Sequence, residues 1–259
     1  MEKEFDKQDA KCSSEQFLRT LGVNSIDCDF ITLQHQLERA LAKQTIDSPP
    51  THWEDEYIGR LLSSGDSVLD LGCGNGELLA SIAELADVRC QGVECDRKAA
   101  LTCIEKGLPV CLMDLDKVLE NVQPQSFTYA VLERTLQTLP QPLETLKEML
   151  RVARYGVVSF PNFAHWSVRL SFALGGRMPV TGSLPYHWYD TPNIHLCSIN
   201  DFLDWIAENR LRVCQAWAYL DDEVVEFVAA KHNIAAREVL FVIESPRVRM
   251  KSFFADSSQ

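Results

Sequence analysis

Short apolar runs alternate along the chain with segments whose apolar residues recur every three or four positions. Seven of these runs have the length and composition of buried strands. They cover 67–72, 88–94, 108–113, 126–132, 154–160, 211–220 and 237–244. Helical spacing predicts helices over 77–86, 97–106 and 142–150, from 199 onward, and over 222–233. This alternation predicts an α/β fold around a mainly parallel sheet.

Local signals mark three of the helix starts. Asp96 has a residue type that favours the N-cap, the position just before a helix. Pro142 suits the first helical position, where no backbone N–H is needed. Ser198, followed by Asp201 three residues later, resembles a capping box, with aspartate where glutamate or glutamine is usual. We therefore expect helices to begin directly after these positions.

The first 48 residues differ from the rest in their pattern. The stretch "SSEQFLRTLG" predicts one short helix, and "LQHQLERALAK" predicts a second. The second helix carries one apolar stripe, made of Leu33, Leu37, Ala40 and Leu41. Ser48-Pro49-Pro50 then breaks the chain. We predict a helical arm over 1–50, one domain over 51–250 and a tail over 251–259.

Composition narrows the class of protein. The 259 residues are 46% hydrophobic and 24% charged, which is typical of a globular chain. The net charge of −12 argues against a nucleic-acid partner, because such proteins usually carry a basic face. No stretch approaches the roughly 18–20 apolar residues that span a bilayer. The charged start "MEKEFDKQDA" is not a secretory signal, so we expect no membrane association and a cytoplasmic location.

The nine cysteines predict neither a metal site nor a disulfide framework. None of them forms a C-x-x-C pair, and the closest two are Cys90 and Cys95. Zinc sites need tighter paired spacing. We expect reduced thiols that pack as small hydrophobic side chains.

A glycine-rich turn follows the first predicted strand, in the stretch "VLDLGCGNG" at 68–76. Gly72, Gly74 and Gly76 can adopt positive φ and let a ligand approach the backbone. The helix that follows offers unpaired N–H groups at its start. Ligands of such sheets bind outside the carboxyl ends of the strands, so this turn predicts a ligand site.

Three ligand classes compete for the turn. A nucleoside triphosphate loop would need the pattern G-x-x-x-x-G-K-[ST], and the turn contains no lysine. A dinucleotide loop would follow G-x-G-x-x-G, but the third glycine comes one residue early and Glu77 stands in its place. A pyrophosphate fits poorly beside that carboxylate. S-adenosylmethionine has no phosphate, so it needs no strong anion site.

Carboxylates at three strand ends favour this third ligand. Asp70 lies just before the turn and can hold an ammonium group, directly or through water. Glu94 ends the second strand, 20 residues after Gly74, where it can accept hydrogen bonds from both ribose hydroxyls. Asp114 follows the third strand and can reach the adenine amino group. Three acids of this kind suit a cationic nucleoside better than a pyrophosphate.

The combination resembles the Rossmann-like S-adenosylmethionine-dependent methyltransferases. "VLDLGCGNG" matches their first motif and "GVECD" their second, although Thr128 replaces the aspartate that many members carry at the fourth strand. The resemblance implies the class I methyltransferase fold, with a seven-stranded sheet and helices on both faces. The predicted cofactor-binding residues are Asp70, Gly72, Cys73, Gly74, Asn75, Gly76, Glu94, Cys95, Asp114, Leu115 and Leu132. The predicted ligands are S-adenosylmethionine and its product S-adenosylhomocysteine.

The second half of the chain carries a more specific resemblance. The [N/D]-P-P-[F/Y] motif of many nitrogen methyltransferases is absent after the fourth strand, which reads "LERTLQT". Instead "TLQ", "RMPVT" and "WYDTPNIHLC" resemble the methionine biosynthesis protein MetW. That family implies a role in methionine biosynthesis alongside homoserine O-acyltransferase. An active methyltransferase on an unidentified small molecule is the alternative. The chain departs from the family at Glu133-Arg134, where members tend to be uncharged.

Residues 161–197 read as a long, aromatic-rich loop, which we predict to form a lid over the carboxyl edge of the sheet. Long loops inside compact domains are usually functional. His165 and Tyr189 are candidates for a catalytic base, and Asp190 can orient one of them. For each residue alone, packing within the lid or a satisfied polar contact is the more ordinary role.

Overall fold

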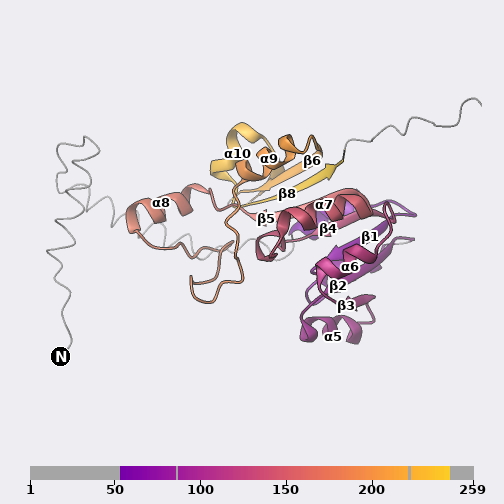
Figure 1. Ribbon diagram of the computed structural model, residues 1–259. Helices are drawn as coiled ribbons and strands as arrows, with labels where there is room; N and C mark the ends of the chain where they lie inside the picture. The colour runs from indigo at the N-terminus through magenta and orange to yellow at the C-terminus, as the bar shows by residue number, and fades with distance from the viewer. Residues whose placement is uncertain (1–52, 86, 221–222, 246–259) are drawn as a thin grey trace, which may run out of the picture.

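The computed structural model describes residues 53–85, 87–220 and 223–245. The predicted arm and tail lie outside this part of the chain, and so do the two helices predicted within the arm. The described residues form one mixed sheet with helices packed on both faces (Figure 1).

The sheet has eight strands in the order β3-β2-β1-β4-β5-β8-β6-β7. Strands β3 to β5 in this order are parallel, whereas β8, β6 and β7 pair antiparallel. The strand order reverses direction between β1 and β4, and such a switch point is where ligands of open α/β sheets bind. The strands are β1 (Ser67–Leu71), β2 (Arg89–Glu94), β3 (Val110–Leu112), β4 (Phe127–Leu132), β5 (Ala153–Pro161), β6 (Arg212–Tyr219), β7 (Val224–Glu226) and β8 (Glu238–Glu244).

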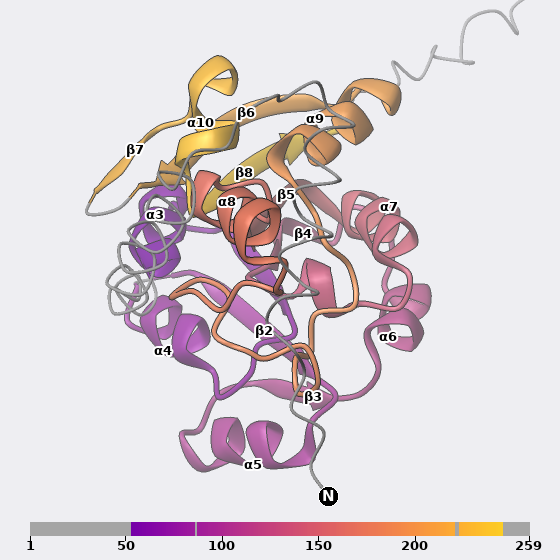
Figure 2. The same ribbon diagram turned by 90° about the vertical axis from the view of Figure 1, so that its left-hand side faces the viewer.

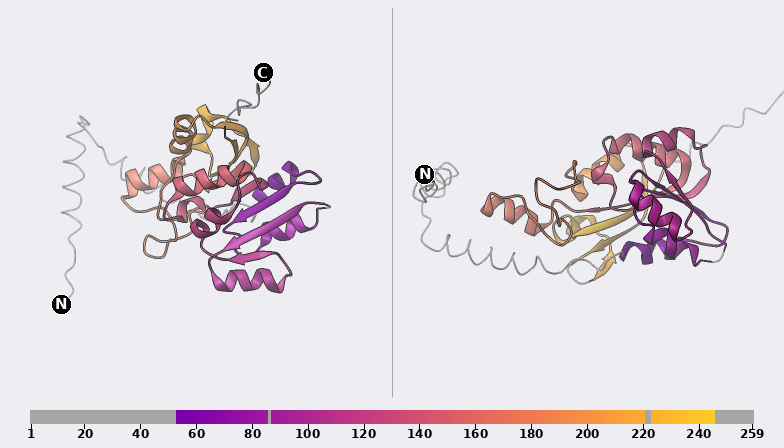
Figure 3. Two further views of the ribbon diagram at one scale, coloured as in Figure 1. Left: turned by 45° about the vertical axis from the view of Figure 1, so that its right-hand side comes forward. Right: turned by 90° about the horizontal axis from the view of Figure 1, so that it is seen from below.

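Helices cover the sheet in two layers, which Figure 2 shows from the carboxyl edge of the parallel strands. One layer holds α3 (Trp53–Leu61), α4 (Glu77–Ala83) and α5 (Arg97–Glu105). The other holds α6 (Leu115–Asn121), α7 (Pro142–Val152) and α9 (Ile199–Glu208). A short 3₁₀ helix, η1 (Leu136–Thr138), follows β4, and α10 (Ala229–Ala235) precedes β8. In Figures 1 and 3, α8 (Trp166–Gly175) projects away from the sheet at the carboxyl edge.

Each face of the sheet has its own apolar core. On one face, Ile58 of α3 and Ile82 of α4 pack against Val131 of β4. On the other, Met149 of α7 and Phe202 of α9 pack against a larger cluster around Phe241. Burial of such side chains stabilises a fold by roughly 1.5–3 kcal/mol each. Both layers therefore hold the strand ends in fixed positions.

The predicted helix starts are confirmed. The Asp96 side chain accepts a hydrogen bond from Ala99 N and begins α5. Pro142 is the first residue of α7. Ser198 and Asp201 form the reciprocal capping box at the start of α9. Asp96 and Ser198 bond to backbone groups within three residues, and Pro142 acts through its own fixed φ, so none of these signals depends on tertiary contacts.

Other expectations need correction. The sheet has one strand more than the seven predicted, because β7 pairs with β6 where a helix over 222–233 was expected. The helix in that region, α10, covers only its second half. The segment 161–197, predicted as a loop throughout, contains α8. Helix α3 was not predicted, although Trp53, Tyr57, Ile58 and Leu61 have helical spacing.

Candidate functional site

The glycine-rich turn between β1 and α4 has the backbone that its sequence predicts. Gly72, Gly74 and Gly76 all have positive φ, at 82°, 53° and 81°. A Cβ on Gly72 would lie 2.8 Å from Cγ2 of Thr135, and one on Gly76 would lie 2.7 Å from a methyl of Leu108. A Cβ on Gly74 would meet nothing within 4 Å. Two glycines are thus required by packing, whereas the middle one faces open space.

Glu94, at the end of β2, holds the turn in place. Its Oε2 accepts a hydrogen bond from Gly74 N at 2.8 Å, and its Oε1 accepts one from Asp96 N at 2.7 Å. The side chain is 8% exposed. A carboxylate that accepts two backbone N–H bonds is strongly fixed. The structure therefore joins the two predicted motifs through one side chain.

Asp70 lies buried beneath the same turn and is only 2% exposed. Burial raises its pKa from 3.8 to about 8, and the charges of Asp55, Glu94 and Glu77 act in the same direction. Burial likewise raises the pKa of the Cys73 thiol. A carboxyl group with such a raised pKa keeps its proton near neutral pH. A cation bound beside it would lower this pKa and favour the ionised carboxylate.

The remaining predicted cofactor residues fall into two groups. Asn75, Cys95 and Asp114 are exposed at the carboxyl edge. Leu115 and Leu132 are instead part of the apolar core beneath the edge. The first group can contact a ligand directly, and the second supports the strand ends.

A partly buried ionic cluster beside the turn was not predicted from the sequence. Arg134, which follows β4, forms ion pairs with Glu238 of β8 and, at 3.6 Å, with Glu54 of α3. Both glutamates are fully buried. Trp53 Nε1 donates to Glu238 Oε2 at 2.9 Å. The only sequence signal was the charged pair Glu133-Arg134 directly after an apolar strand.

This ionic cluster, made of Glu54, Asp55, Glu133, Arg134 and Glu238, holds more acids than described cations. Burial and the neighbouring charge of Glu238 together raise the pKa of Glu54 to about 8, against the opposing effect of Arg134. Burial also raises the pKa of Glu133 to about 10, with Glu54 and Asp55 acting in the same direction. The cluster reaches Asp70, whose charge also raises the pKa of Glu133. The turn and the cluster therefore form one acidic edge.

The three candidate catalytic residues have different surroundings. His165 is 3% exposed and caps α8, where its Nδ1 accepts a hydrogen bond from Ser167 N at 3.3 Å. Tyr189 is 68% exposed and stacks on His187 with ring centroids 5.3 Å apart. Asp190 is exposed, and its backbone N–H donates to His187 O. His165 thus has a structural role at a helix start, and Tyr189 lies on an exposed surface.

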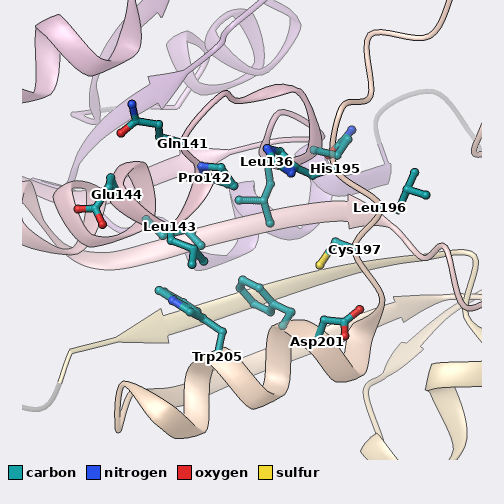
Figure 4. Close-up of a pocket in the computed structure, with 13 residues that line it drawn as sticks. Leu136, Gln141, Pro142, Leu143, Glu144, His195, Leu196, Cys197, Asp201 and Trp205 are labelled. Atoms are coloured by element: carbon teal, nitrogen blue, oxygen red, sulfur yellow. The ribbon is translucent and has the colours of Figure 1, made fainter. Parts of the chain in front are cut away.

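A cavity of about 510 Å³ lies between α7 and α9 (Figure 4). Leu143 lines it from α7, Trp205 from α9, and Leu196 from the segment that leads into α9. None of the predicted cofactor residues lines this cavity. The cavity therefore lies in the helix layer that contains α7 and α9, and it is separate from the predicted cofactor site.

Comparison with known proteins identifies the family. The family described as "Methionine biosynthesis protein MetW" matches residues 53–243. The chain belongs to the MetW family. A curated relative is the "Bifunctional methionine biosynthesis protein MetXA/MetW" of Rhodopirellula baltica, which is 36% identical over 164 residues. That match covers 60% of this chain and 26% of the relative, so the chain spans about a quarter of that protein.

Solved structures confirm the Rossmann-like methyltransferase fold. An S-adenosylmethionine-dependent methyltransferase of Thermotoga maritima, described as a possible histamine N-methyltransferase, has a TM-score of 0.55 at 16% identity. The match covers 82% of this chain and 95% of that one. A methyltransferase of Methanosarcina mazei has a TM-score of 0.52 at 16% identity, over 73% and 96% of the two chains. At such identities the likeness establishes the fold alone.

Two features are absent from the described ranges. No group of three or more histidine, cysteine, aspartate or glutamate side chains there is arranged to hold a metal ion. No described helix is both long and apolar enough to cross a membrane.

Proposed function

We propose that the acidic edge formed by the turn and the ionic cluster binds S-adenosylmethionine. The observation that carries the proposal is Glu94, which fixes Gly74 while that glycine faces open space. Asp70 and Glu133 add carboxyl groups near the turn, and a ligand with an ammonium and a sulfonium group would lower their raised pKa values and favour the ionised carboxylates. The same acidic side chains disfavour binding of a negatively charged pyrophosphate. When bound, this cofactor supplies an electrophilic methyl group.

The residues of this chain have defined roles in that proposal. Glu94 orients the turn and accepts hydrogen bonds from the ribose side. Asp70 balances the ammonium group. Asn75, Cys95 and Asp114 contact the exposed side of the nucleoside, while Leu115 and Leu132 fix the strand ends beneath it.

We further propose that the chain acts with homoserine O-acyltransferase in methionine biosynthesis, as a cofactor-binding accessory subunit. The curated relative carries MetXA and MetW in one bifunctional protein, which supports an association between the two functions. S-adenosylmethionine is made from methionine, so a subunit that binds it can report the output of the pathway to a partner enzyme. This role requires binding of the cofactor, and it does not require catalysis.

The alternative is methyl transfer to a small molecule. The similar protein of Thermotoga maritima is described as a possible histamine N-methyltransferase, and an acidic edge suits an amine acceptor. Segment 161–197 would then act as a lid over the acceptor, with His165, Tyr189 and Asp190 as candidate catalytic residues. Proximity supplies much of the rate of such reactions, so a strong base is not essential.

Two measurements separate these functions. The first follows cofactor turnover with labelled S-adenosylmethionine and a panel of amines. The second tests co-purification of the chain with homoserine O-acyltransferase from the same organism. Association without turnover supports the accessory role. Turnover without association contradicts it and supports the alternative.

A further inference from the structure

The cavity between α7 and α9 is lined mainly by apolar side chains. They come from η1, both helices and the segment before α9, and they include Leu136, Leu143, Leu146, Leu196, Phe202 and Trp205. In Figure 4, Leu143 and Trp205 lie on opposite sides of the cavity. Pockets that bind small molecules have volumes of roughly 300–1,000 Å³, and this cavity of about 510 Å³ lies within that range. Its size and lining therefore fit a small, mainly apolar ligand.

One wall of the cavity is a rigid pair of aromatic rings. Phe202 and Trp205 of α9 stack with their ring centroids 5.7 Å apart, and only 3% and 8% of these residues are exposed. Phe202 also packs edge-on against Phe160 of β5, at 5.1 Å between centroids. Because the sheet holds this pair from behind, the wall is formed before any ligand binds, as is usual for small-molecule sites.

The charged groups of the lining are compensated within the chain. Glu144 pairs with Lys147 at 2.8 Å. Asp201 accepts hydrogen bonds from the backbone and the hydroxyl of Ser198 in the capping box of α9, where the helix start also favours its negative charge. Burial, and then the charge of Asp201, raises the pKa of the Cys197 thiol to about 12, so this thiol is neutral. The lining therefore favours a neutral ligand.

Gln137 of η1 adds one polar group whose bonding is incomplete. The residue lines the cavity and is 5% exposed. Its Nε2 donates to Arg134 O at 2.6 Å, which fixes the nitrogen as the amide atom that faces this carbonyl. Its Oε1 is buried and accepts no hydrogen bond from the described residues. A buried acceptor without a donor is unfavourable, and an N–H or O–H group of a ligand would remove that penalty.

The backbone of Gln137 also fixes its position between two parts of the lining. Its carbonyl accepts hydrogen bonds from Ile194 N at 2.9 Å and from His195 N at 3.1 Å. These bonds join η1 to the segment that leads into α9. The acceptor thus belongs to a part of the cavity that is held by three hydrogen bonds of one residue, and it can select a ligand by its donor.

We propose that the cavity between α7 and α9 binds a neutral, mainly apolar small molecule that donates one hydrogen bond to Gln137 Oε1. The hydrocarbon part of this molecule packs between Leu143 and the Phe202–Trp205 pair. None of the predicted cofactor residues lines the cavity. The molecule is therefore a second ligand, which binds in addition to the proposed cofactor and does not replace it.

The fluorescent probe N-phenyl-1-naphthylamine tests this proposal, because it is neutral and aromatic, has one N–H donor, and brightens when it leaves water. Titration of the full-length protein should give a saturable increase in fluorescence with one site per chain. The ether 1-phenoxynaphthalene has a similar shape but no donor, so it should compete with at least fivefold lower affinity than the probe. An excess of S-adenosylhomocysteine should not displace the probe.

A matched pair of variants locates the probe. Leu143→Glu places a charge on the apolar wall and should weaken binding of the probe about tenfold or more. Leu101→Glu, at a similarly exposed leucine of α5, should leave the affinity unchanged. Circular dichroism checks that both variants are folded.

Four outcomes would overturn the proposal. They are the absence of saturable binding, equal affinities for the amine and the ether, displacement by S-adenosylhomocysteine, and unchanged affinity in Leu143→Glu. Cofactor binding is measured separately, so failure here leaves the proposed function untouched.

Discussion

Glu94 and Glu54 are buried carboxylates at the same edge of the sheet, but their surroundings differ. Glu94 accepts two backbone N–H bonds, from residues 20 positions before it and two positions after it. Within the described part of the chain no other residue donates a hydrogen bond to the Glu54 carboxylate, and its ion pair with Arg134 spans 3.6 Å. One carboxylate is satisfied by the turn it holds, whereas the other depends on a cation 80 residues away in sequence.

Glu94 belongs to a local sequence motif, whereas Glu54 belongs to a cluster formed by distant segments. The turn and its carboxylate belong to one β-α-β unit, so the same short segment that forms the site also stabilises it. The ionic cluster joins α3, the end of β4 and β8, and it exists only once these elements have assembled. We therefore expect changes in the cluster to affect stability most, and changes at Glu94 to affect ligand binding.

The largest effect is expected from Arg134→Met. It leaves Glu54 and Glu238 buried without their described cation, which should lower the free energy of unfolding by about 3 kcal/mol. Arg60→Met is the control, because the Arg60–Glu56 pair is exposed and such pairs contribute about 0.5 kcal/mol. Urea unfolding at pH 8 measures both. Equal losses of the free energy of unfolding in the two variants would contradict a stabilising role of the ionic cluster.

A smaller effect is expected from Gly72→Ala. The new Cβ would combine a φ of 82° with a 2.8 Å contact to Thr135, which should lower the free energy of unfolding by about 2 kcal/mol. Gly74→Ala also has positive φ but meets no neighbour, so it should lose only about 1 kcal/mol. The same urea titration compares them. A greater loss for Gly74→Ala would contradict the packing described for the turn.

The pH dependence should differ between stability and binding. Between pH 4 and pH 8, Asp70 keeps a proton in the folded state that the unfolded chain has released, because its pKa is raised to about 8. The free energy of unfolding should therefore fall as the pH rises through this range. Glu54 acts in the same direction.

Binding of S-adenosylmethionine should instead strengthen up to about pH 8, because the cation needs the ionised carboxylate. The expected gain is up to about tenfold per pH unit, and it should level off above pH 8. Calorimetry across pH 6–9 measures it, with Asp70→Asn as the variant that flattens the profile. An affinity that falls with pH in this range would contradict the role of Asp70.

Sequence patterns predicted those parts of the molecule that are encoded locally. Seven of the eight strands, the helices α4, α5, α7 and α9, the Asp96 cap, the Ser198–Asp201 capping box and the glycine-rich turn depend on neighbours within a few residues. The proposed roles of the cofactor residues follow from the same short motifs, and they remain predictions.

Several of the parts that were missed depend on contacts between distant segments. Trp53 and Glu238 are 185 residues apart, and no pattern in either segment indicates their bond. β7 is three residues long and is a strand only because β6 pairs with it. His165 was predicted from its residue type as a base, but its neighbour Ser167 gives it a capping role that was not expected.

The central claim is that the turn fixed by Glu94 binds the cofactor. Calorimetry with S-adenosylhomocysteine tests it most directly, in the native protein, in Glu94→Gln and in the control Glu77→Gln, whose side chain is 39% exposed. We expect binding by the native protein, a loss of about 1–3 kcal/mol in Glu94→Gln, and almost no change in the control. No binding by the native protein, or equal affinity in Glu94→Gln, would contradict the account.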